Sequence, residues 1–390
     1  MIDFEIPRDL EEARQKVKRF VFDVAIPAES RDHGGHGLAD DLRAELQAAA
    51  REAGIFAPGV GGDLGGLGLD MRGQAVVLEE AGYSILGPQA LNCAAPDEGN
   101  MHLLAKVATA AQRERFLAPL ARGEIRSCFA MSEPAPGAGS DPSMLRTRAE
   151  RVAGGWSISG RKWFATGAEG AAFAICMALT DAGATMFLVP TDRPGWRIER
   201  LLDVNDRGFP GGHAELAIED CRVDDDAVLG AVGEGFSYAQ VRLAPARLTH
   251  CMRWIGAARR ALDVAIERAI EREAFGLRLL DQGMVQERIA RSVIDLEAAR
   301  ALTWRGAWAL DAGLPARRES SIAKAHVAEV VVEIVDRAVQ ICGALGLTAD
   351  TPLRRLADEI RPFRIYDGPT ETHYSSIARR AARELAADRA

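Results

Sequence analysis

The chain contains 390 residues, 48% of them hydrophobic and 27% charged, with a formal net charge of -8. This length is sufficient for two or three domains with a substantial buried core. Because acidic and basic residues are mixed and no basic block occurs, the composition disfavours nucleic-acid binding. No apolar stretch approaches the ~18–20 residues that a membrane span requires.

The cysteine and histidine residues indicate neither disulfides nor a metal site. The six cysteines are scattered without a Cys-x-x-Cys pair, which is typical of reduced thiols in a cytoplasmic protein. The N-terminus lacks a basic region followed by an apolar run, so we expect no signal peptide and a cytoplasmic location. His33 and His36 have His-x-x-His spacing, but no further ligand is near them, and we expect a solvated loop there.

Residues 1–125 are predicted to form an N-terminal α-helical domain. Helical patterns cover 10–24, 40–53, 73–81, 101–108 and 112–120. Gly54 is expected to end the second of these helices. The segments 59–68 and 92–100 are rich in Gly or Pro and interrupt the pattern. Neither Gly-x-Gly-x-x-Gly nor Gly-Lys-Ser/Thr occurs in the first of these segments, so it carries no phosphate-binding motif.

The remaining chain is predicted to form two further domains. Over 126–235, short runs of β-branched and aromatic residues alternate with Gly and Pro, which favours an antiparallel β domain. Over 236–390 the helical pattern returns, with an apolar stripe from Leu248 to Ala269 and similar patterns over 284–310 and 322–345. A fourth helix is expected after Pro369. The sequence therefore predicts an α+β protein in which a C-terminal four-helix bundle follows the β domain.

The segment 128–166 has a composition that suits a flat, hydrogen-bonding ligand. It contains Met131-Ser-Glu-Pro, Gly137-Ala-Gly-Ser-Asp141 and Lys162-Trp-Phe-Ala-Thr166. Small residues let backbone amides approach a ligand, hydroxyls donate hydrogen bonds, and aromatic rings cover a face. From these residues alone, a ligand site and an ordinary β-domain loop are equally good interpretations. No Gly-x-Ser-x-Gly motif is present, so hydrolase chemistry has no visible nucleophile.

Residues 364–372, Arg-Ile-Tyr-Asp-Gly-Pro-Thr-Glu-Thr, admit two interpretations. Asp-Gly-Pro-x-Glu is a good helix start, with Asp or Gly as the cap, Pro at the first helical position and Glu in the first turn. The alternative is that Asp367 is a catalytic base. Taken alone, the pattern favours the helix start, and the two interpretations are compatible.

Four motifs in order resemble the acyl-CoA dehydrogenase family. The two segments Met131-Ser-Glu-Pro with 137–141 and Lys162-Trp-Phe-Ala-Thr166 look like its flavin-binding signatures. Arg272-Glu-Ala-Phe-Gly276 and 336–343 are similar to its C-terminal motifs. The resemblance covers nearly the whole chain and implies an acyl-CoA dehydrogenase-like fold. Segment 92–101 with Asp367-Gly-Pro resembles the branch that, in animals, carries an extra kinase-like domain upstream, and we expect this chain to be a stand-alone version.

The resemblance implies FAD as the cofactor and a set of site residues. Flavin-ring contacts are implied for Phe129, Met131, Ser132, Phe164 and Thr166. Contacts to FAD held by a neighbouring subunit are implied for Arg272, Phe275, Gln340, Gly343 and Ala344. Contacts along the CoA arm of the substrate are implied for Ser140 and Arg247. The alternatives are that Phe129, Met131 and Phe164 are plain core, that Arg272 forms a surface ion pair, and that Arg247 is structural at a helix start.

The family reaction removes a proton beside the thioester carbonyl while the flavin accepts a hydride from the adjacent carbon. In most relatives the base is a Glu at the position of Asp367; in another branch it is a Glu just before the Arg that matches Arg247. That second position is Ala246 here, so the resemblance implies Asp367 as the base. The chain departs from the family pattern at Ala135-Pro136, an apparent insertion that puts Ser140 in doubt, at Pro369, where many relatives have a hydroxyl, and at Ala344, usually a Gly.

The resemblance therefore implies an FAD-dependent acyl-CoA dehydrogenase that forms a 2,3-enoyl-CoA in fatty acid β-oxidation. It implies an electron-transfer flavoprotein as acceptor and a homodimer or homotetramer as the assembly. Two other functions remain open. One is a flavin-dependent oxidase on the same fold, of the nitroalkane oxidase type, in which an Asp is also the base. The other is a non-catalytic protein that binds acyl-CoA or flavin.

Overall fold

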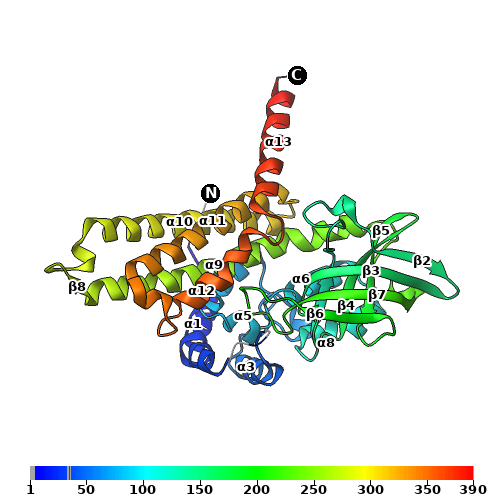
Figure 1. Cartoon of the computed structure of the whole chain (residues 1–390), viewed down its shortest axis with the longest axis horizontal. Helices are drawn as coiled ribbons and strands as arrows, with labels where there is room; N and C mark the ends of the chain where they lie inside the picture. Colours follow the sequence, from blue (N-terminus) through cyan, green and yellow to red (C-terminus); the bar gives the residue numbers. More distant parts are fainter. Residues whose placement is uncertain (1–4, 33–34, 36, 390) are drawn as a thin grey trace. The chain divides into compact units, whose positions relative to one another are not determined.

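The structure is a computed structural model that describes residues 5–32, 35 and 37–389 (Figure 1). The chain folds into two compact units. The helical unit consists of Met1–Glu29, Leu69–Pro88 and Arg247–Ala390. The sheet unit consists of Ser30–Gly68 and Gln89–Ala246. The predicted His33 and His36 loop lies outside the described residues.

The helical unit is built mainly from long helices. Its elements are α1 (Arg8–Phe20), α2 (Ile26–Ala28), α4 (Met71–Ala81), the part of α9 (Gly235–Glu271) from Arg247 on, α10 (Gly283–Asp311), α11 (Arg317–Cys342), α12 (Leu353–Ile360) and α13 (Thr370–Asp388). A two-stranded hairpin, β8 (Glu273–Ala274) and β9 (Leu277–Arg278), connects α9 to α10. The apolar stripe predicted from Leu248 is buried, as are Cys251, Ile255 and Leu262 farther along the same helix.

The C-terminal helix differs from the prediction of a fourth bundle helix. Its first turn is anchored, because Thr370 and His373 are buried. Most of the residues after His373 are exposed, and Figure 1 shows α13 (red) extending away from α11 and α12. Ala and Arg fill the last part of this helix, so it lacks the apolar stripe that would bury it in the same chain.

The sheet unit contains a seven-stranded sheet. Its strands are β1 (Ser127–Ala130), β2 (Arg148–Val152), β3 (Gly155–Thr166), β4 (Phe173–Thr180), β5 (Gly183–Pro190), β6 (Trp196–Leu201) and β7 (His213–Asp224). They lie in the order β1-β4-β2-β3-β7-β6, with β5 paired to β4. The predicted antiparallel pairing holds for β2–β3, β3–β7, β4–β5 and β6–β7. The pairings of β1 and β2 with β4 are parallel, because longer connections separate those strands in the chain.

Short helices complete the sheet unit. They are α3 (Asp40–Glu52), α5 (Gly87–Ala90), which begins in the helical unit, α6 (Asp97–Val107), α7 (Ala110–Gln112) and α8 (Ala118–Ala121). The helix predicted from Met101 begins earlier, at Asp97, since Asp97 and Glu98 directly follow Pro96 and suit a first helical turn. Apolar residues of α6, including Leu103 and Leu104, form one core with β4 and β5.

All six cysteines are buried and free. Within residues 5–32, 35 and 37–389, no group of three potential metal ligands comes together. None of the helices in that part of the chain has both the length and the apolar character needed to cross a membrane.

Candidate functional site

The two flavin-type signatures of the sheet unit are joined by a buried ion pair. Lys162 Nζ lies 2.9 Å from Glu133 Oε1, and the two side chains are 0% and 3% exposed. Lys162 also donates to the carbonyl oxygen of Met131 at 3.1 Å, and Thr147 donates to Glu133 from its backbone and its hydroxyl. Burial opposes the charged carboxylate, but Lys162 and the Thr147 hydrogen bonds hold the pKa of Glu133 below its usual value. The ion pair thus fixes the position of the first signature against the second.

A β-bulge in the second signature turns an aromatic ring outward. Between Lys162 and Ala165, β3 has one residue more than β7. The Trp163 amide donates to the Ser132 carbonyl at 3.1 Å, which links the bulge to the first signature. Phe164 has φ +48° and remains 45% exposed. A bulky residue in the left-handed region is strained, and such strain is concentrated at functional sites.

The Thr166 hydroxyl lies beside a buried histidine. Thr166 Oγ1 is 2.8 Å from His213 Nδ1, and His213 Nε2 is 3.3 Å from Asp206 Oδ2. The rings of Phe164 and Phe209 lie 5.9 Å and 5.3 Å from the His213 ring. Phe164 and Thr166, which sequence reasoning grouped as flavin contacts, are therefore brought together around one histidine.

Phe129, Met131 and Ser132 follow one another along β1 and the segment after it. Phe129 and Met131 are partly buried and pack at the edge of the sheet-unit core, so the alternative of plain core applies to part of their surface. The Arg242 guanidinium lies 4.1 Å from the centre of the Phe129 ring and donates to Asn100 Oδ1 at 2.8 Å. Asn100 belongs to segment 92–101, which thereby supports the first signature.

Ser140 lies exposed in the loop between β1 and β2. This loop turns where the Gly137 amide donates to the Pro134 carbonyl at 2.9 Å, and it is tied back by the Glu133 amide, which donates to the Ala138 carbonyl. Ala135 and Pro136, the predicted insertion, are exposed in the same turn. The contact of Ser140 with the CoA arm remains a prediction.

The candidate base occupies a strained and firmly held turn in the helical unit. Asp367 has φ +54° and Gly368 has φ +97°. Arg247 Nε donates to the Asp367 carbonyl at 3.0 Å, and His373 Nε2 lies 3.2 Å from the same oxygen. Lys324 Nζ donates to the Gly368 carbonyl at 2.6 Å. Three side chains from α9, α11 and α13 therefore hold two successive carbonyls, which offsets the cost of a left-handed Asp.

The electrostatics of the turn follow from burial. Burial lowers the pKa of Lys324 to about 8, although the negative charge of Asp367 opposes this effect. Burial, with the positive charges of Arg247 and Lys324, lowers the pKa of His373 to about 4. His373 is therefore neutral at neutral pH, and its Nε2 must carry the proton to donate to the Asp367 carbonyl.

The interpretation of Asp367 as a helix cap is wrong. The N-cap of α13 is Pro369, and within the described part of the chain no side chain bonds to the free amides there. The predicted order placed Pro at the first helical position. The ψ of Pro369 is 151°, which is extended. The helix therefore begins one residue later than predicted, because the Asp367-Gly368 turn is fixed by its hydrogen bonds.

Arg272 and Phe275 lie on the hairpin that follows α9. Phe275 and Gly276 are the two central residues of its turn, with φ +55° and +78°, as in a type I′ turn. Such turns favour Asn-Gly, yet this one carries a Phe that is 98% exposed. The alternative of a surface ion pair for Arg272 finds no support, since no such pair is formed within the described residues.

Gln340, Gly343 and Ala344 are exposed where α11 ends. Gly343 has φ +62°, and a Cβ added there would meet no atom within 4 Å. Arg268, near the end of α9, lies close enough to affect the Cys342 thiol electrostatically. The end of α11 therefore lies beside the end of α9, and the predicted cross-subunit residues share one end of the helical unit.

Sequence reasoning missed the residues that support the site. Lys324 and His373 hold the Asp367 turn, His213 contacts Thr166, and His250 lies beside Asp367. Most of these residues are distant in sequence from the motifs that they support. A signal was present: Lys324 interrupts an otherwise apolar helix face, where a buried Lys requires a partner.

Comparisons with known proteins agree with this description. Three family models match the chain: acyl-CoA dehydrogenase N-terminal domain over residues 7–124, middle domain over 128–221 and C-terminal domain over 233–382. A Mycobacterium tuberculosis protein named "Probable acyl-CoA dehydrogenase FadE2" is 40% identical, over 86% of this chain and 84% of its own length. Chicken acyl-CoA dehydrogenase family member 11 is 35% identical over 95% of this chain, which spans 50% of that protein.

Solved structures show the same fold. A Mycobacterium abscessus protein of known structure superposes with a TM-score of 0.91 at 34% identity, covering 98% of this chain and 100% of the other. Butyryl-CoA dehydrogenase from Megasphaera elsdenii superposes with a TM-score of 0.88 at 26% identity, covering 98% and 100%. The fold with N-terminal helical, middle β and C-terminal helical domains, predicted from the sequence, is thereby confirmed.

Proposed function

Because this chain belongs to the acyl-CoA dehydrogenase family of FAD-dependent oxidoreductases, we propose that it oxidises an acyl-CoA thioester to the 2,3-enoyl-CoA with Asp367 as the base. The observation that carries the proposal is the Asp367 turn. Its side chain is 15% exposed, its backbone is strained, and Arg247, Lys324 and His373 hold the carbonyls of the turn. A carboxylate fixed in this way is suited to remove a proton from one position of a bound substrate.

The residues present fit FAD. Phe164 and Phe275 are exposed aromatic rings at strained backbone positions, which a protein retains where a ligand uses the ring. Phe129, Met131, Ser132, Phe164 and Thr166 would contact the flavin ring. Arg272, Phe275, Gln340, Gly343 and Ala344 would contact FAD of a neighbouring subunit. When bound, FAD supplies the acceptor for the hydride that leaves the β-carbon.

Asp367 would take the α-proton. An Asp is shorter than the usual Glu by one C–C bond, about 1.5 Å, so the backbone must bring its carboxylate closer to the substrate. The backbone at position 367 is left-handed, with φ above zero. Asp tolerates this conformation better than Glu does, so the shorter residue suits the turn. Arg247, predicted to bind the CoA arm, donates to the Asp367 carbonyl, which supports a second role for it in fixing the turn.

The proposed assembly is a homodimer or homotetramer, with an electron-transfer flavoprotein as the electron acceptor. The exposure of Phe275 and Gln340 supports a neighbouring subunit, since an exposed Phe gains by being covered. The similarity to family member 11 supports the branch with the Asp-Gly-Pro motif. We also propose a cytoplasmic location, which cell fractionation tests. We further propose a place in fatty acid β-oxidation, which growth on fatty acids tests.

Anaerobic mixing with a panel of acyl-CoAs, followed by flavin absorbance, tests the reaction. The wild type should bleach with at least one thioester, and Asp367→Asn should reduce the bleaching rate by about 10³-fold or more. Glu371→Gln, an exposed change on the adjoining helix α13, should retain the wild-type rate. Rapid reoxidation of the reduced flavin by oxygen without a carrier would indicate an oxidase. A wild type that binds thioesters without bleaching would indicate a non-catalytic binding protein.

A further inference from the structure

One carboxylate oxygen of Asp367 lacks a hydrogen bond although it is buried. Asp367 Oδ2 is shielded from solvent, and within the described residues nothing bonds to it. Leaving a buried carboxylate oxygen unsatisfied is costly, so an orphaned atom of this kind needs an explanation. A neighbouring titratable group explains it: His250 Nε2, from α9, lies 3.6 Å away.

The surroundings of His250 determine which ring nitrogen carries its proton. Arg253 Nη2 lies 3.1 Å from His250 Nδ1. A guanidinium is a donor only, so Nδ1 must be the acceptor in this contact. The neutral imidazole therefore carries its proton on Nε2, the nitrogen that faces Asp367 Oδ2.

Further contacts fix the orientation of the ring. The Tyr366 hydroxyl lies 3.4 Å from His250 Nδ1 and accepts from Trp254 Nε1 at 2.5 Å. The Phe363 and Tyr366 rings lie 5.8 Å and 4.8 Å from the imidazole, and His250 is 6% exposed. The imidazole has little room to rotate, so the Nε2–H stays directed at Asp367.

We propose that His250 is a positioning residue for Asp367: its Nε2–H donates to Oδ2 when the site closes on substrate, and this leaves Oδ1 to take the α-proton. The inference rests on the proposed role of Asp367 as the base. Hydrogen bonds of catalytic groups are often long without a ligand and shorten in the complex, which accounts for the distance of 3.6 Å.

His250 is not a proton relay in this arrangement. Its Nε2 already carries a proton, and its Nδ1 lone pair receives Arg253, so neither nitrogen is available to take a proton from Asp367. Other charged or titratable groups around the turn are Arg247, Lys324, His373 and Tyr366, with Arg253 on the far side of His250 and with Glu329 and Cys251 near Lys324. The first three contact backbone carbonyls, so His250 is the group directed at the carboxylate itself.

A pair of substitutions tests the proposal in the FAD-loaded protein. His250→Leu removes the donor, whereas His250→Gln retains an N–H that can reach Oδ2. His250→Leu should slow flavin bleaching at saturating acyl-CoA by about tenfold or more, because the carboxylate loses its fixed orientation. The acidic limb of its pH profile should move up by about one pH unit, since a donor favours the carboxylate form. His250→Gln should restore most of the rate, and the acyl-CoA Kd should change in neither variant.

The controls separate this inference from the proposed function. If the wild type bleaches and Asp367→Asn does not, the base is established. Wild-type rates and pH profiles in both His250 variants would then overturn the positioning role alone. His102→Leu, on α6 outside the proposed machinery, is the matched substitution and should retain the wild-type rate.

A spectroscopic readout applies even if the variants fold poorly. With ¹⁵N-labelled histidine, wild-type His250 should give the neutral Nε2–H pattern, and Asp367→Asn should shift its Nε2 signal. A neutral Nδ1–H pattern would overturn the proposal.

Discussion

Lys324 donates to the Gly368 carbonyl at 2.6 Å although its side chain is fully buried. The ammonium thus supports the turn that holds Asp367, at a cost in desolvation that its lowered pKa reflects. Replacing an ammonium by a methyl group would remove this support without leaving a charge behind, and Lys324→Met is the corresponding variant.

Lys324 gives the protein a stability that rises with pH in the alkaline range. Its pKa is about 8 when folded, against an ordinary value of 10.5. Between these values the unfolded chain binds the proton and the folded chain does not, so the free energy of unfolding increases with pH there. The rise should total roughly 3 kcal/mol. Urea unfolding should show that Lys324→Met lacks this rise, whereas Lys106→Met, at an exposed position, retains it. An equal rise in both variants would assign it to other groups.

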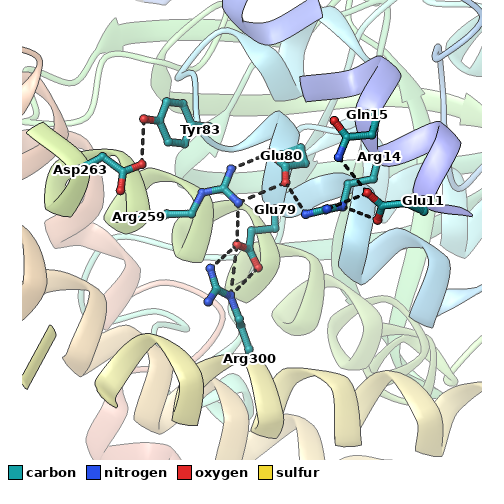
Figure 2. Close-up of polar contacts among 9 residues, drawn as sticks. All are labelled: Glu11, Arg14, Gln15, Glu79, Glu80, Tyr83, Arg259, Asp263 and Arg300. Atoms are coloured by element: carbon teal, nitrogen blue, oxygen red, sulfur yellow. Dashed lines mark hydrogen bonds and ion pairs between the residues drawn. The ribbon is translucent and has the colours of Figure 1, made fainter. Parts of the chain in front are cut away.

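A network of ion pairs around the buried carboxylates Glu79 and Glu80 joins α1, α4, α9 and α10 (Figure 2). Glu79 receives Arg300 at 2.7 Å and Arg259 at 3.0 Å, and Glu80 receives Arg259 at 2.6 Å. Glu79→Gln removes the negative charge that balances the guanidinium groups of Arg259 and Arg300. It should lower the free energy of unfolding by about 3 kcal/mol.

The matched control is the surface pair of Arg8 and Glu12, whose side chains are 94% and 63% exposed. Glu12→Gln should change the free energy of unfolding by less than about 0.5 kcal/mol. The two changes should also differ in salt response, because a buried pair is screened less than an exposed one. Equal effects of the two substitutions would show that the network contributes no more than a surface pair.

The crossing of α4 and α9 depends on glycine. A Cβ added to Gly256 would overlap the Glu79 carbonyl oxygen, and one added to Gly82 would overlap that of Arg253. Gly256→Ala must push the helices apart and should destabilise the protein by more than about 3 kcal/mol. Gly283→Ala, in α10, meets no atom within 4 Å and should be neutral or stabilising by up to about 1 kcal/mol. Thermal unfolding of both variants checks this; a Gly256→Ala Tm within the error of wild type would contradict the close crossing.

The sequence predicted the order of the N-terminal helical, middle β and C-terminal helical regions because apolar residues recur with a clear period in each. The apolar stripe from Leu248 and the β-type run over 213–218 are local patterns, and local patterns determine element type. The parallel pairing of β1 with β4 depends on contacts between distant segments. No periodicity over one segment contains that information.

The site was predictable only where the chain resembles a family. The family motifs identified Phe164, Phe275 and Asp367 as site residues. They did not predict that all three have a positive φ. Propensity rules would place Asn or Gly at such positions, so the sequence read locally favoured a helix cap for Asp367. His250 shows the limit most clearly, because its role depends on Arg253 and Tyr366, which reach it from one turn along α9 and from the Asp367 segment.

Phe275 allows stability and cofactor binding to be separated. Its position in the turn favours Asn, so Phe275→Asn should relieve strain and leave the Tm unchanged or higher. If the ring covers FAD of a neighbouring subunit, the same change should weaken FAD binding by about tenfold or more, since a buried aromatic contact is lost. Titration of the apoprotein with FAD, monitored by flavin fluorescence, measures the Kd. Leu314→Asn replaces another exposed apolar residue and should leave FAD binding unchanged. A Phe275→Asn variant that is more stable and binds FAD like the wild type would remove this residue from the cofactor site.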